Sequence, residues 1–261
     1  MSEPRPPRVM VLGAAGLIGH AAATALRAAG CEVTAVARRF SPGQRFDPAI
    51  AHVEAPFVEG GGAVLAPLVE AAAPDVVVNC VGVLGDAPGV SADAVHHGFL
   101  AACLAVLASH PDTLLVHVSV PGEAADDGTP FARTKRAADE ALAGSGHPFV
   151  ILRPGFVLGA NAYGGSALMR MIAALPLLLP EPERARPFRV IAMDDLTAAM
   201  VAVVRSWRQA RTPEAAVWDV MSEEATTLGD VLDGLRDWLG TTGGVRIPRW
   251  MLGLGARCGD L

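Results

Sequence analysis

The sequence predicts an α/β fold, a doubly wound parallel sheet followed by a small C-terminal α/β cap. Over residues 8–155, short β-branched apolar runs alternate with longer alanine-rich segments of helical period. This alternation is typical of a parallel sheet covered by helices on both faces. A glycine-rich turn joins the first apolar run to the first helical segment. Together these features predict a Rossmann-like domain.

The elements of this domain follow from their boundaries. Each helical segment is bounded by Gly, Pro or an Asn, Asp, Ser or Thr that can cap it, and Gly30 ends the first one. Strands are expected near 8–13, 32–37, 51–54, 75–81, 113–119 and 148–153, and helices near 17–29, 63–73, 92–109 and 130–144. The dinucleotide-binding domain is therefore predicted to span 8–155.

The pattern changes after residue 155, where glycines and prolines interrupt the chain. We expect cap elements over 156–245, interleaved with the main domain and lying over the carboxyl ends of the main strands. The expected helices are 166–175, 194–208 and 226–239, and the expected strands lie near 188–191 and 216–221. Residues 246–261 are predicted to begin a truncated C-terminal extension.

Composition narrows the class of protein. The 261 residues are 51% hydrophobic, which suffices for a doubly covered sheet, and the formal net charge of −6 argues against a nucleic-acid partner. The four cysteines lie far apart, which predicts reduced thiols in a cytoplasmic protein. Arg170 and Pro176 interrupt the apolar stretch 167–180, and no export signal is recognised, so no membrane partner is expected for this chain.

Three glycines in the first turn predict a dinucleotide site. Gly13 can make the tight turn, Gly16 lets the backbone approach a pyrophosphate, and Gly19 permits close packing of helix on strand. The helix amino terminus then faces the phosphates. The alternative is a merely tight strand-to-helix turn. The predicted cofactor-binding residues of this loop are Gly13, Ala15, Gly16, Leu17, Ile18 and Gly19.

The end of the second strand suggests which dinucleotide is bound. Arg38 and Arg39 stand where an NAD-selective site usually offers an acidic residue to the adenosine ribose. Guanidinium groups pair well with a 2′-phosphate. NADP(H) is therefore predicted in preference to NAD(H), the alternative being a solvated surface pair.

The fourth strand ends in a small turn beside the predicted nucleotide crevice. The backbone of Cys80, Val81 and Gly82 could line the adenine and ribose side of the cofactor. A buried parallel strand that ends in glycine would have the same sequence. These three residues are nevertheless included in the predicted cofactor-binding set.

Phe131 and Lys135 lie four residues apart on the helix that Thr129 and Pro130 introduce. In dehydrogenases that this segment resembles, such a lysine holds the nicotinamide ribose and a tyrosine four residues before it supplies a proton, which phenylalanine cannot do. The alternative for Lys135 is a solvated helix lysine. Losing a general acid typically lowers the rate by a factor on the order of 10²–10⁴. Tyr163, the only tyrosine, is one candidate substitute, although packing in its loop is the simpler interpretation.

The fifth strand ends at Ser119, whose hydroxyl could face the nicotinamide, and a shift of one residue would put Val120 there instead. Lys135 and Ser119 are the predicted catalytic residues. His96 and His97 form a pair without a further metal ligand at useful spacing, so they are interpreted as helix-surface or core histidines, and no metal site is predicted.

Four segments carry a family resemblance: 13–19, 131–140, 151–159 and 189–196. They resemble the atypical and extended short-chain dehydrogenase/reductase superfamily, specifically its NAD-dependent epimerase/dehydratase-like group near the complex I accessory-subunit relatives. The resemblance implies a Rossmann fold, bound NAD(P), and substrates such as nucleotide sugars or small carbonyl compounds. The family's Tyr-x-x-x-Lys pair is Phe131 and Lys135 here.

Three functions follow as expectations. The leading one is an atypical NADP(H)-linked oxidoreductase acting on an unidentified small molecule. The alternatives are a non-catalytic dinucleotide-binding sensor or assembly module, and a sugar-nucleotide epimerase or dehydratase, which the missing tyrosine disfavours. The helices over 92–109 and 130–144 are candidates for a homodimer interface.

Overall fold

The computed structural model describes residues 5–44, 46–122, 128–161, 165–212, 215–224, 226–241 and 243–248. The chain divides into two units that alternate along the sequence. Unit 1 runs to Pro154 and includes Met193–Val220, whereas unit 2 comprises Gly155–Ala192 and the chain from Met221 onward.

Unit 1 is built on a seven-stranded sheet whose strands are all parallel, in the order β10-β6-β5-β4-β1-β2-β3. The sheet confirms the predicted Rossmann-like α/β class. Its inner strands consist almost entirely of buried apolar residues, as expected for a sheet covered on both faces. The strands are β1 (Arg8–Leu12), β2 (Glu32–Ala37), β3 (Ala51–Glu54), β4 (Val76–Asn79), β5 (Leu114–Val118), β6 (Phe149–Pro154) and β10 (Ala215–Val220).

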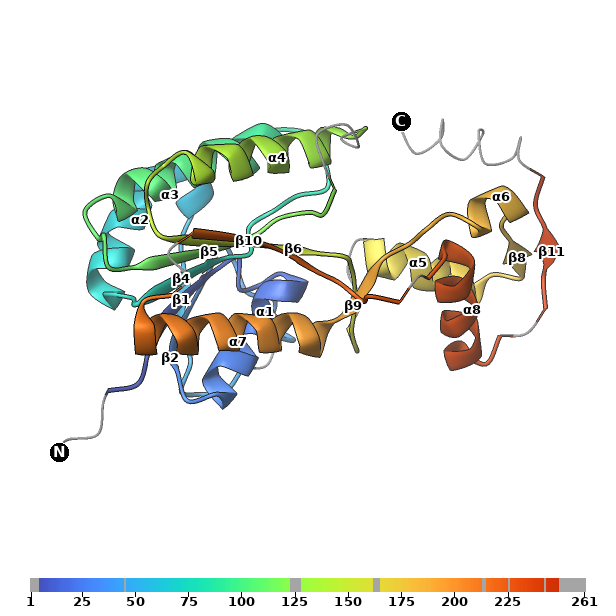
Figure 1. Ribbon diagram of the computed structural model, residues 1–261, viewed down its shortest axis with the longest axis horizontal. Helices are drawn as coiled ribbons and strands as arrows, with labels where there is room; N and C mark the ends of the chain where they lie inside the picture. The colour runs from blue at the N-terminus through green and yellow to red at the C-terminus, as the bar shows by residue number, and fades with distance from the viewer. Residues whose placement is uncertain are drawn as a thin grey trace. The chain divides into compact units, whose positions relative to one another are not determined.

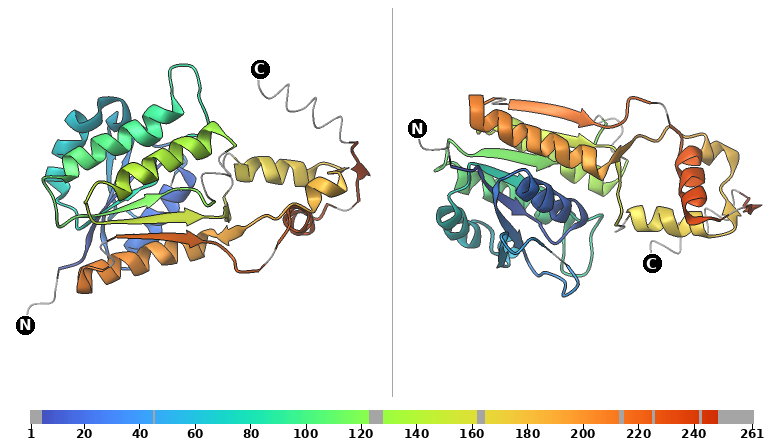
Figure 2. Two further views of the ribbon diagram at one scale, coloured as in Figure 1. Left: turned by 45° about the horizontal axis from the view of Figure 1, so that its top comes forward. Right: turned by 90° about the horizontal axis from the view of Figure 1, so that it is seen from below.

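Helices cover both faces of this sheet, as Figures 1 and 2 show. On one face α1 packs against α7, and on the other α2, α3 and α4 follow one another in contact. These helices are α1 (Leu17–Ala28), α2 (Phe57–Ala72), α3 (Phe99–Leu107), α4 (Pro130–Ala143) and α7 (Met193–Ala210). A π-helical turn, η1 (Ala94–Gly98), leads directly into α3.

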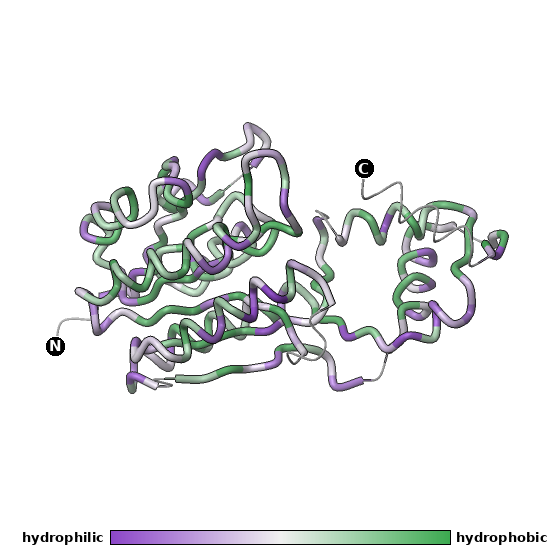
Figure 3. Tube along the Cα trace, turned by 90° about the horizontal axis from the view of Figure 1, so that it is seen from above, coloured by the Kyte–Doolittle hydropathy of each residue, from purple (hydrophilic) through white to green (hydrophobic). Residues whose placement is uncertain are grey.

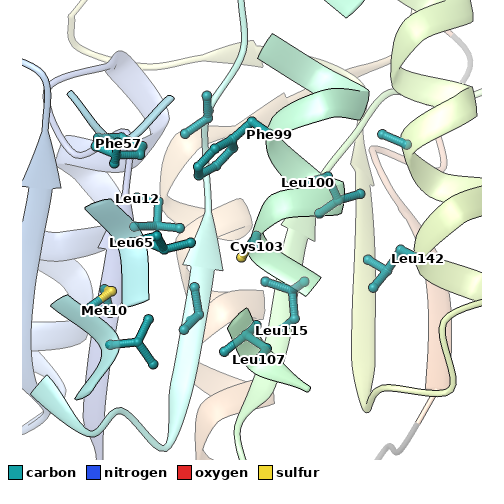
Figure 4. Packing of buried hydrophobic residues seen from close by; sticks show 14 of the residues in the cluster. Met10, Leu12, Phe57, Leu65, Phe99, Leu100, Cys103, Leu107, Leu115 and Leu142 are labelled. Carbon is teal, nitrogen blue, oxygen red and sulfur yellow. The ribbon is translucent and has the colours of Figure 1, made fainter. Parts of the chain in front are cut away.

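The larger hydrophobic cluster lies between the sheet and α2, α3 and α4 (Figure 4). Leu12 of β1, Leu65 of α2 and Leu100 of α3 have no exposed surface. Figure 3 colours the chain by hydropathy and shows the central strands as hydrophobic. The rigid layer fixes the carboxyl ends of β1, β4 and β5, from which the candidate site is built.

The structure corrects the predicted membership of the cap. The segments expected as a cap helix at 194–208 and a cap strand at 216–221 are α7 and β10, and both belong to unit 1. β10 pairs with β6 along its full length, from Ala215 beside Phe149 to Val220 beside Pro154. An alternating strand that returns to the main sheet after an insertion looks the same in sequence as a strand of a separate cap, which is why the prediction failed.

Two helices in unit 1 also differ from expectation. α2 consists of two helical segments joined by a kink at Gly61 (φ 52°). The segment after the kink matches the helix expected at 63–73, and the short segment from Phe57 was not expected. The expected helix at 92–109 is divided between η1 and α3. π-helical turns occur mostly as single insertions near functional sites.

Unit 2 is small. Its described residues form two two-stranded parallel pairs, three helices and a hydrophobic cluster centred on Met169, Ala173, Val231 and Leu232. Its elements are β7 (Phe156–Leu158), α5 (Gly165–Ala174), β8 (Leu177–Leu178), α6 (Glu181–Arg184), β9 (Val190–Ala192), α8 (Leu228–Leu239) and β11 (Val245–Arg246). Among the helices within the described ranges, none has the length and apolar character needed to cross a membrane.

Candidate functional site

The glycine turn between β1 and α1 forms the first part of the site. Gly13 has a positive φ of 79°, which favours glycine, and the amides of Gly13 and Ala14 both donate to the Val36 carbonyl at 3.0 Å. Gly16 precedes α1 as its N-cap, and no side chain caps the helix there. The amino terminus of α1 can therefore offer backbone N–H groups to an anion.

Gly19 is sterically required. A Cβ at Gly19 would lie 2.3 Å from the Gly13 carbonyl oxygen, and one at Gly16 would lie 3.3 Å from the same atom. The first distance is impossible for a side chain unless the turn moves. Gln44 steadies the turn from outside, since its Nε2 donates to the Ala15 carbonyl at 2.8 Å.

The end of β2 presents two exposed guanidinium groups. Ala37, the last residue of the strand, is buried, and Arg38 and Arg39 follow it at the surface. Arg38 Nη1 lies 3.2 Å from Glu59 Oε1 on α2, and both side chains are 55% exposed. β2 is adjacent to β1 in the sheet, so the arginines and the glycine turn lie at the carboxyl ends of neighbouring strands.

The end of β4 meets the glycine turn from the other side. A Cβ at Gly13 would lie 3.0 Å from the Cys80 carbonyl carbon and 3.1 Å from the Val81 nitrogen. The Val81 amide is held by the Asn79 Oδ1 acceptor at 3.0 Å. The backbone of Cys80 and Val81 is thus in close contact with the predicted phosphate turn, whereas Gly82 lies beside His96 and Lys135.

Lys135 on α4 ties β4 to β5. Its Nζ donates to the Val81 carbonyl at 3.0 Å and to the Val118 carbonyl at 2.9 Å, and the side chain is buried. Burial lowers the pKa of Lys135 to about 8, although the Asp139 carboxyl acts in the opposite direction. A Cβ placed on Gly82 would lie 3.5 Å from this Nζ, so the amine borders the predicted crevice.

Phe131 occupies the first turn of α4, which begins as predicted with Thr129 accepting from the Ala132 amide and Pro130 in the first turn. The Phe131 ring packs edge-on against His96 with their centroids 5.5 Å apart. Position 131 therefore presents a phenyl ring, without the hydroxyl that a tyrosine would bring.

His96 is buried through the π-helical turn and is fully engaged. Its Nε2 accepts from the Val83 amide at 3.0 Å, and its Nδ1 lies 2.8 Å from Thr134 Oγ1. Thr134 in turn donates to the Pro130 carbonyl, so His96 Nδ1–H is the donor to the threonine. Burial, followed by the charge of Lys135, lowers the pKa of His96 to about 4. His96 is accordingly neutral at pH 7.

A second buried histidine, His117 on β5, was not anticipated from sequence. Asn79 Nδ2 lies 3.1 Å from His117 Nδ1 and donates to it, since the amide oxygen of Asn79 is occupied by Val81. His117 Nε2 lies 3.9 Å from Asp139 Oδ1. Burial holds the pKa of His117 well below its usual range.

Asp139 also escaped sequence reasoning, although it lies one helical turn after Lys135. Arg153 at the end of β6 binds its Oδ2 through Nε at 3.0 Å and Nη2 at 2.9 Å. Burial raises the pKa of Asp139, and Ser119, Arg153 and Arg136 act against that shift. The sequence did contain a signal for this site: Asp139 lies four residues after Lys135 and three after Arg136, so the three side chains share one side of the helix.

Ser119 directly follows β5, and its catalytic role stays a prediction. Its hydroxyl is buried and lies beside Asp139, between the sheet and α4. The structure thus gathers the glycine turn, the end of β4 and Lys135 at one edge, and turns Ser119 toward the interior. Tyr163 lies outside the described residues, as does the extension after Pro248. Within the described ranges, no cluster of His, Cys, Asp and Glu side chains is suited to hold a metal ion.

Comparison with solved structures supports the fold. A UDP-glucose 4-epimerase of Thermus thermophilus, in complex with NAD, has a TM-score of 0.73 at 18% identity, covering 92% of this chain and 86% of that one. A UDP-glucose 4-epimerase of Thermotoga maritima, with UDP-glucose, has a TM-score of 0.74 at 15% identity, covering 92% of this chain and 85% of that one. A dTDP-glucose 4,6-dehydratase of Bacillus anthracis, in complex with NAD, has a TM-score of 0.73 at 15% identity, covering 93% of this chain and 85% of that one.

No curated protein matches the sequence at a significant level. Residues 9–217, most of the chain, match the family described as the NAD dependent epimerase/dehydratase family. That span begins at the strand before the glycine turn and ends within β10, so it includes the whole site described above. The chain therefore belongs to the NAD dependent epimerase/dehydratase family.

Proposed function

We propose that the chain binds a nicotinamide dinucleotide at the carboxyl ends of β1, β2 and β4. The observation that carries this proposal is the glycine turn itself: it leads into an α1 terminus that no side chain caps, and at Gly13 it lies against the backbone that follows β4. Backbone N–H groups and a helix dipole would meet the pyrophosphate there. Several solved relatives with this fold are complexes with NAD.

The proposed preference is NADP(H). The last residue of β2 is Ala37, which offers no carboxylate to a ribose, and Arg38 and Arg39 follow it. A guanidinium that leaves Glu59 can form charge-assisted hydrogen bonds with a 2′-phosphate. Arg38 would exchange its hydrogen bond with Glu59 for one with the phosphate.

We further propose an oxidoreductase of atypical type acting on a small carbonyl compound. When bound, the cofactor would supply or accept hydride. Lys135 would hold the nicotinamide ribose and provide the proton that a tyrosine provides elsewhere, because its pKa of about 8 leaves it charged but acidic near neutral pH. Ser119, whose buried hydroxyl lies beside Asp139, would act through that carboxyl group rather than by touching substrate.

Phe131 favours a second candidate function. Its ring packs on His96, whose two nitrogens are already engaged, so neither residue offers a proton to a substrate. A dinucleotide-binding module that senses redox state or stabilises an assembly needs the cofactor contacts only. The epimerase and dehydratase activities named for the solved relatives are the less favoured candidates for this chain.

The first experiment is a calorimetric titration with NADPH and with NADH, for the native chain and the Arg38→Ala variant. We expect NADPH to bind more tightly, and loss of Arg38 to remove about tenfold or more of that preference, the equivalent of one charge-assisted hydrogen bond. NADH affinity serves as the internal control. Absence of binding to either dinucleotide would refute both candidate functions.

The Phe131→Tyr variant separates the two candidates. If the chain is a reductase, the native protein consumes NADPH with some member of a carbonyl panel, at a rate that falls as pH rises through about 8. If it is a binding module, the native protein is inactive with every member although it binds the dinucleotide. A tyrosine at 131 beside Lys135 is expected to raise reductase activity in the first case only.

A further inference from the structure

We propose that unit 1 carries a second ligand site, at the edge of the sheet opposite the glycine turn, for a small organic carboxylate with an aromatic or apolar body. A cavity of about 480 Å³ lies at the amino ends of β6 and β10. Ligand pockets usually measure about 300–1,000 Å³. The site needs no dinucleotide, so this inference stands apart from the proposed function.

The walls of the cavity come from three connections that are distant in sequence. Pro111 and Asp112 precede β5, Pro148 lies just before β6, and Trp207 lies near the end of α7. The rings of Pro111, Pro148 and Trp207 line part of the cavity, and Asp112 and Arg211 add polar groups to it. An aromatic or apolar body can pack on those rings.

Arg211 supplies the cation. It follows the end of α7 and lies over the Trp207 ring, with the guanidinium carbon 5.1 Å from the ring centroid. Its Nη1 donates to the Asp112 carbonyl at 2.8 Å, which orients the fork at the rim of the cavity. A guanidinium has five N–H donors, and this bond uses one of them.

Arg211 also has an unusual backbone conformation. Its φ is 54°, a left-handed conformation that glycine adopts most readily at the end of a helix. An arginine therefore occupies a position at which a smaller residue would fold with less strain. Residues held in this way gather at ligand clamps and similar functional sites.

Two buried polar atoms on the cavity's residues have no hydrogen-bond partner among the described residues. Trp207 is 4% exposed, and its Nε1 is one of them; the other is Nε2 of the partly buried His147. Leaving such a group unsatisfied is costly, and buried polar groups almost always find a partner. A carboxylate can accept from the Trp207 N–H beside Arg211, whereas an ammonium group cannot.

His147 adds an acceptor rather than a charge. Burial lowers the pKa of its ring, and the backbone of Thr113 acts in the opposite direction without cancelling that effect. The ring is therefore neutral at pH 7, and its Nε2 suits a water or a hydroxyl of the ligand. The ligand's negative charge is thus expected at Arg211 and Trp207.

The test is an NMR titration of the full chain with 2-naphthoate, which records the indole N–H resonances. The chain has four tryptophans, and the variants Trp218→Phe, Trp238→Phe and Trp250→Phe assign the Trp207 resonance by difference. The side chains of Trp218 and Trp238 are exposed. We expect the Trp207 resonance to move downfield and to saturate. The neutral analogue 2-naphthamide, with the same ring system, is the matched control ligand and should bind at least several-fold more weakly.

Arg211→Gly removes the cation and suits the backbone conformation, so the variant is expected to fold. It should abolish the preference for 2-naphthoate over 2-naphthamide, whereas Arg205→Gln, an exposed arginine of α7 away from the cavity, should leave it unchanged. An unmoved Trp207 resonance in the native chain, or a naphthoate affinity that Arg211→Gly leaves intact, would overturn the proposal.

Discussion

The two halves of the candidate site are built in contrasting ways. The half formed by β1 and α1 is made of backbone: Gly13, Gly16 and Gly19 leave room for one chain segment against another, and no charged side chain takes part. The half formed by α4 and β5 is made of buried polar side chains, with Lys135, Asp139 and His117 close together. The glycine half has no room for additional side-chain atoms, and the polar half needs each of its hydrogen-bonding and charged partners.

This contrast shows what each half can tolerate. A backbone cradle fails when any atom is added, because no rearrangement short of moving the turn makes space. A polar network fails when a partner is removed, because the remaining charges stay buried. The glycine half keeps the spacing expected of its family, and the polar half departs from it at Phe131.

The largest effect is expected for Gly19→Ala. The added Cβ would meet the Gly13 carbonyl oxygen at 2.3 Å, so the turn must open, and dinucleotide binding should fall below detection by calorimetry. Gly234→Ala is the matched control, since Gly234 also lies within a helix but has open space around it. That control should gain about 1 kcal/mol of stability from helix propensity. Normal binding by Gly19→Ala would break the comparison.

The next largest effect is expected for Asp139→Asn. The change leaves Arg153 without its buried counter-charge, and the free energy of unfolding in urea should fall by about 3 kcal/mol. Asp233→Asn tests an ion pair whose carboxylate is half exposed while its partner Arg184 is about as buried as Arg153, and it should cost less than about 1 kcal/mol. Equal losses in the two variants would contradict the claim that burial decides the cost.

A smaller, pH-dependent effect is expected from Lys135. Its pKa is about 8 in the folded protein and 10.5 as the ordinary value, so above pH 8 the unfolded chain binds more protons and stability rises with pH. Relative to Lys135→Met, the native chain should gain about 1 kcal/mol between pH 7 and 9 in urea titrations. A constant difference across that range would show that Lys135 titrates outside it.

The smallest effect is expected at the rim of the glycine half. Glu59→Gln frees Arg38 from its exposed partner, and NADPH affinity should rise a few-fold while NADH affinity stays the same. Glu70→Gln on the same helix makes the same change of charge at an exposed position with no recorded partner, and should alter neither. A parallel rise for both dinucleotides would mean that general charge, not Arg38, is responsible.

Sequence reasoning reached the backbone half of the site more fully than the polar half. Glycine spacing reports steric needs locally, so the turn at Gly13 and its neighbour at Cys80–Gly82 followed from short patterns. His117 and Asp139 were missed because a buried polar network is defined by contacts between β5, α4 and β6, which lie far apart in sequence. Whether Ser119 faced outward depended on a single residue of strand register.

The same distinction holds for the fold. The parallel sheet and most element boundaries could be predicted, because apolar runs and caps are local signals. The return of α7 and β10 to unit 1 could not be predicted, since an edge strand with half-exposed side chains such as Trp218 resembles a cap strand. Only pairing with β6 distinguishes the two.

The alternating course of the chain also governs how the protein can be synthesised and cut. During translation β6 emerges well before β10, and the whole stretch Gly155–Ala192 must leave the ribosome before α7 can cover its face of the sheet. A nascent chain that ends near residue 192 would therefore expose β6 as an unpaired sheet edge, a known template for aggregation. Stop codons or proteolytic cuts in this interval should yield insoluble fragments, and the smallest contiguous piece that completes the sheet extends through Val220.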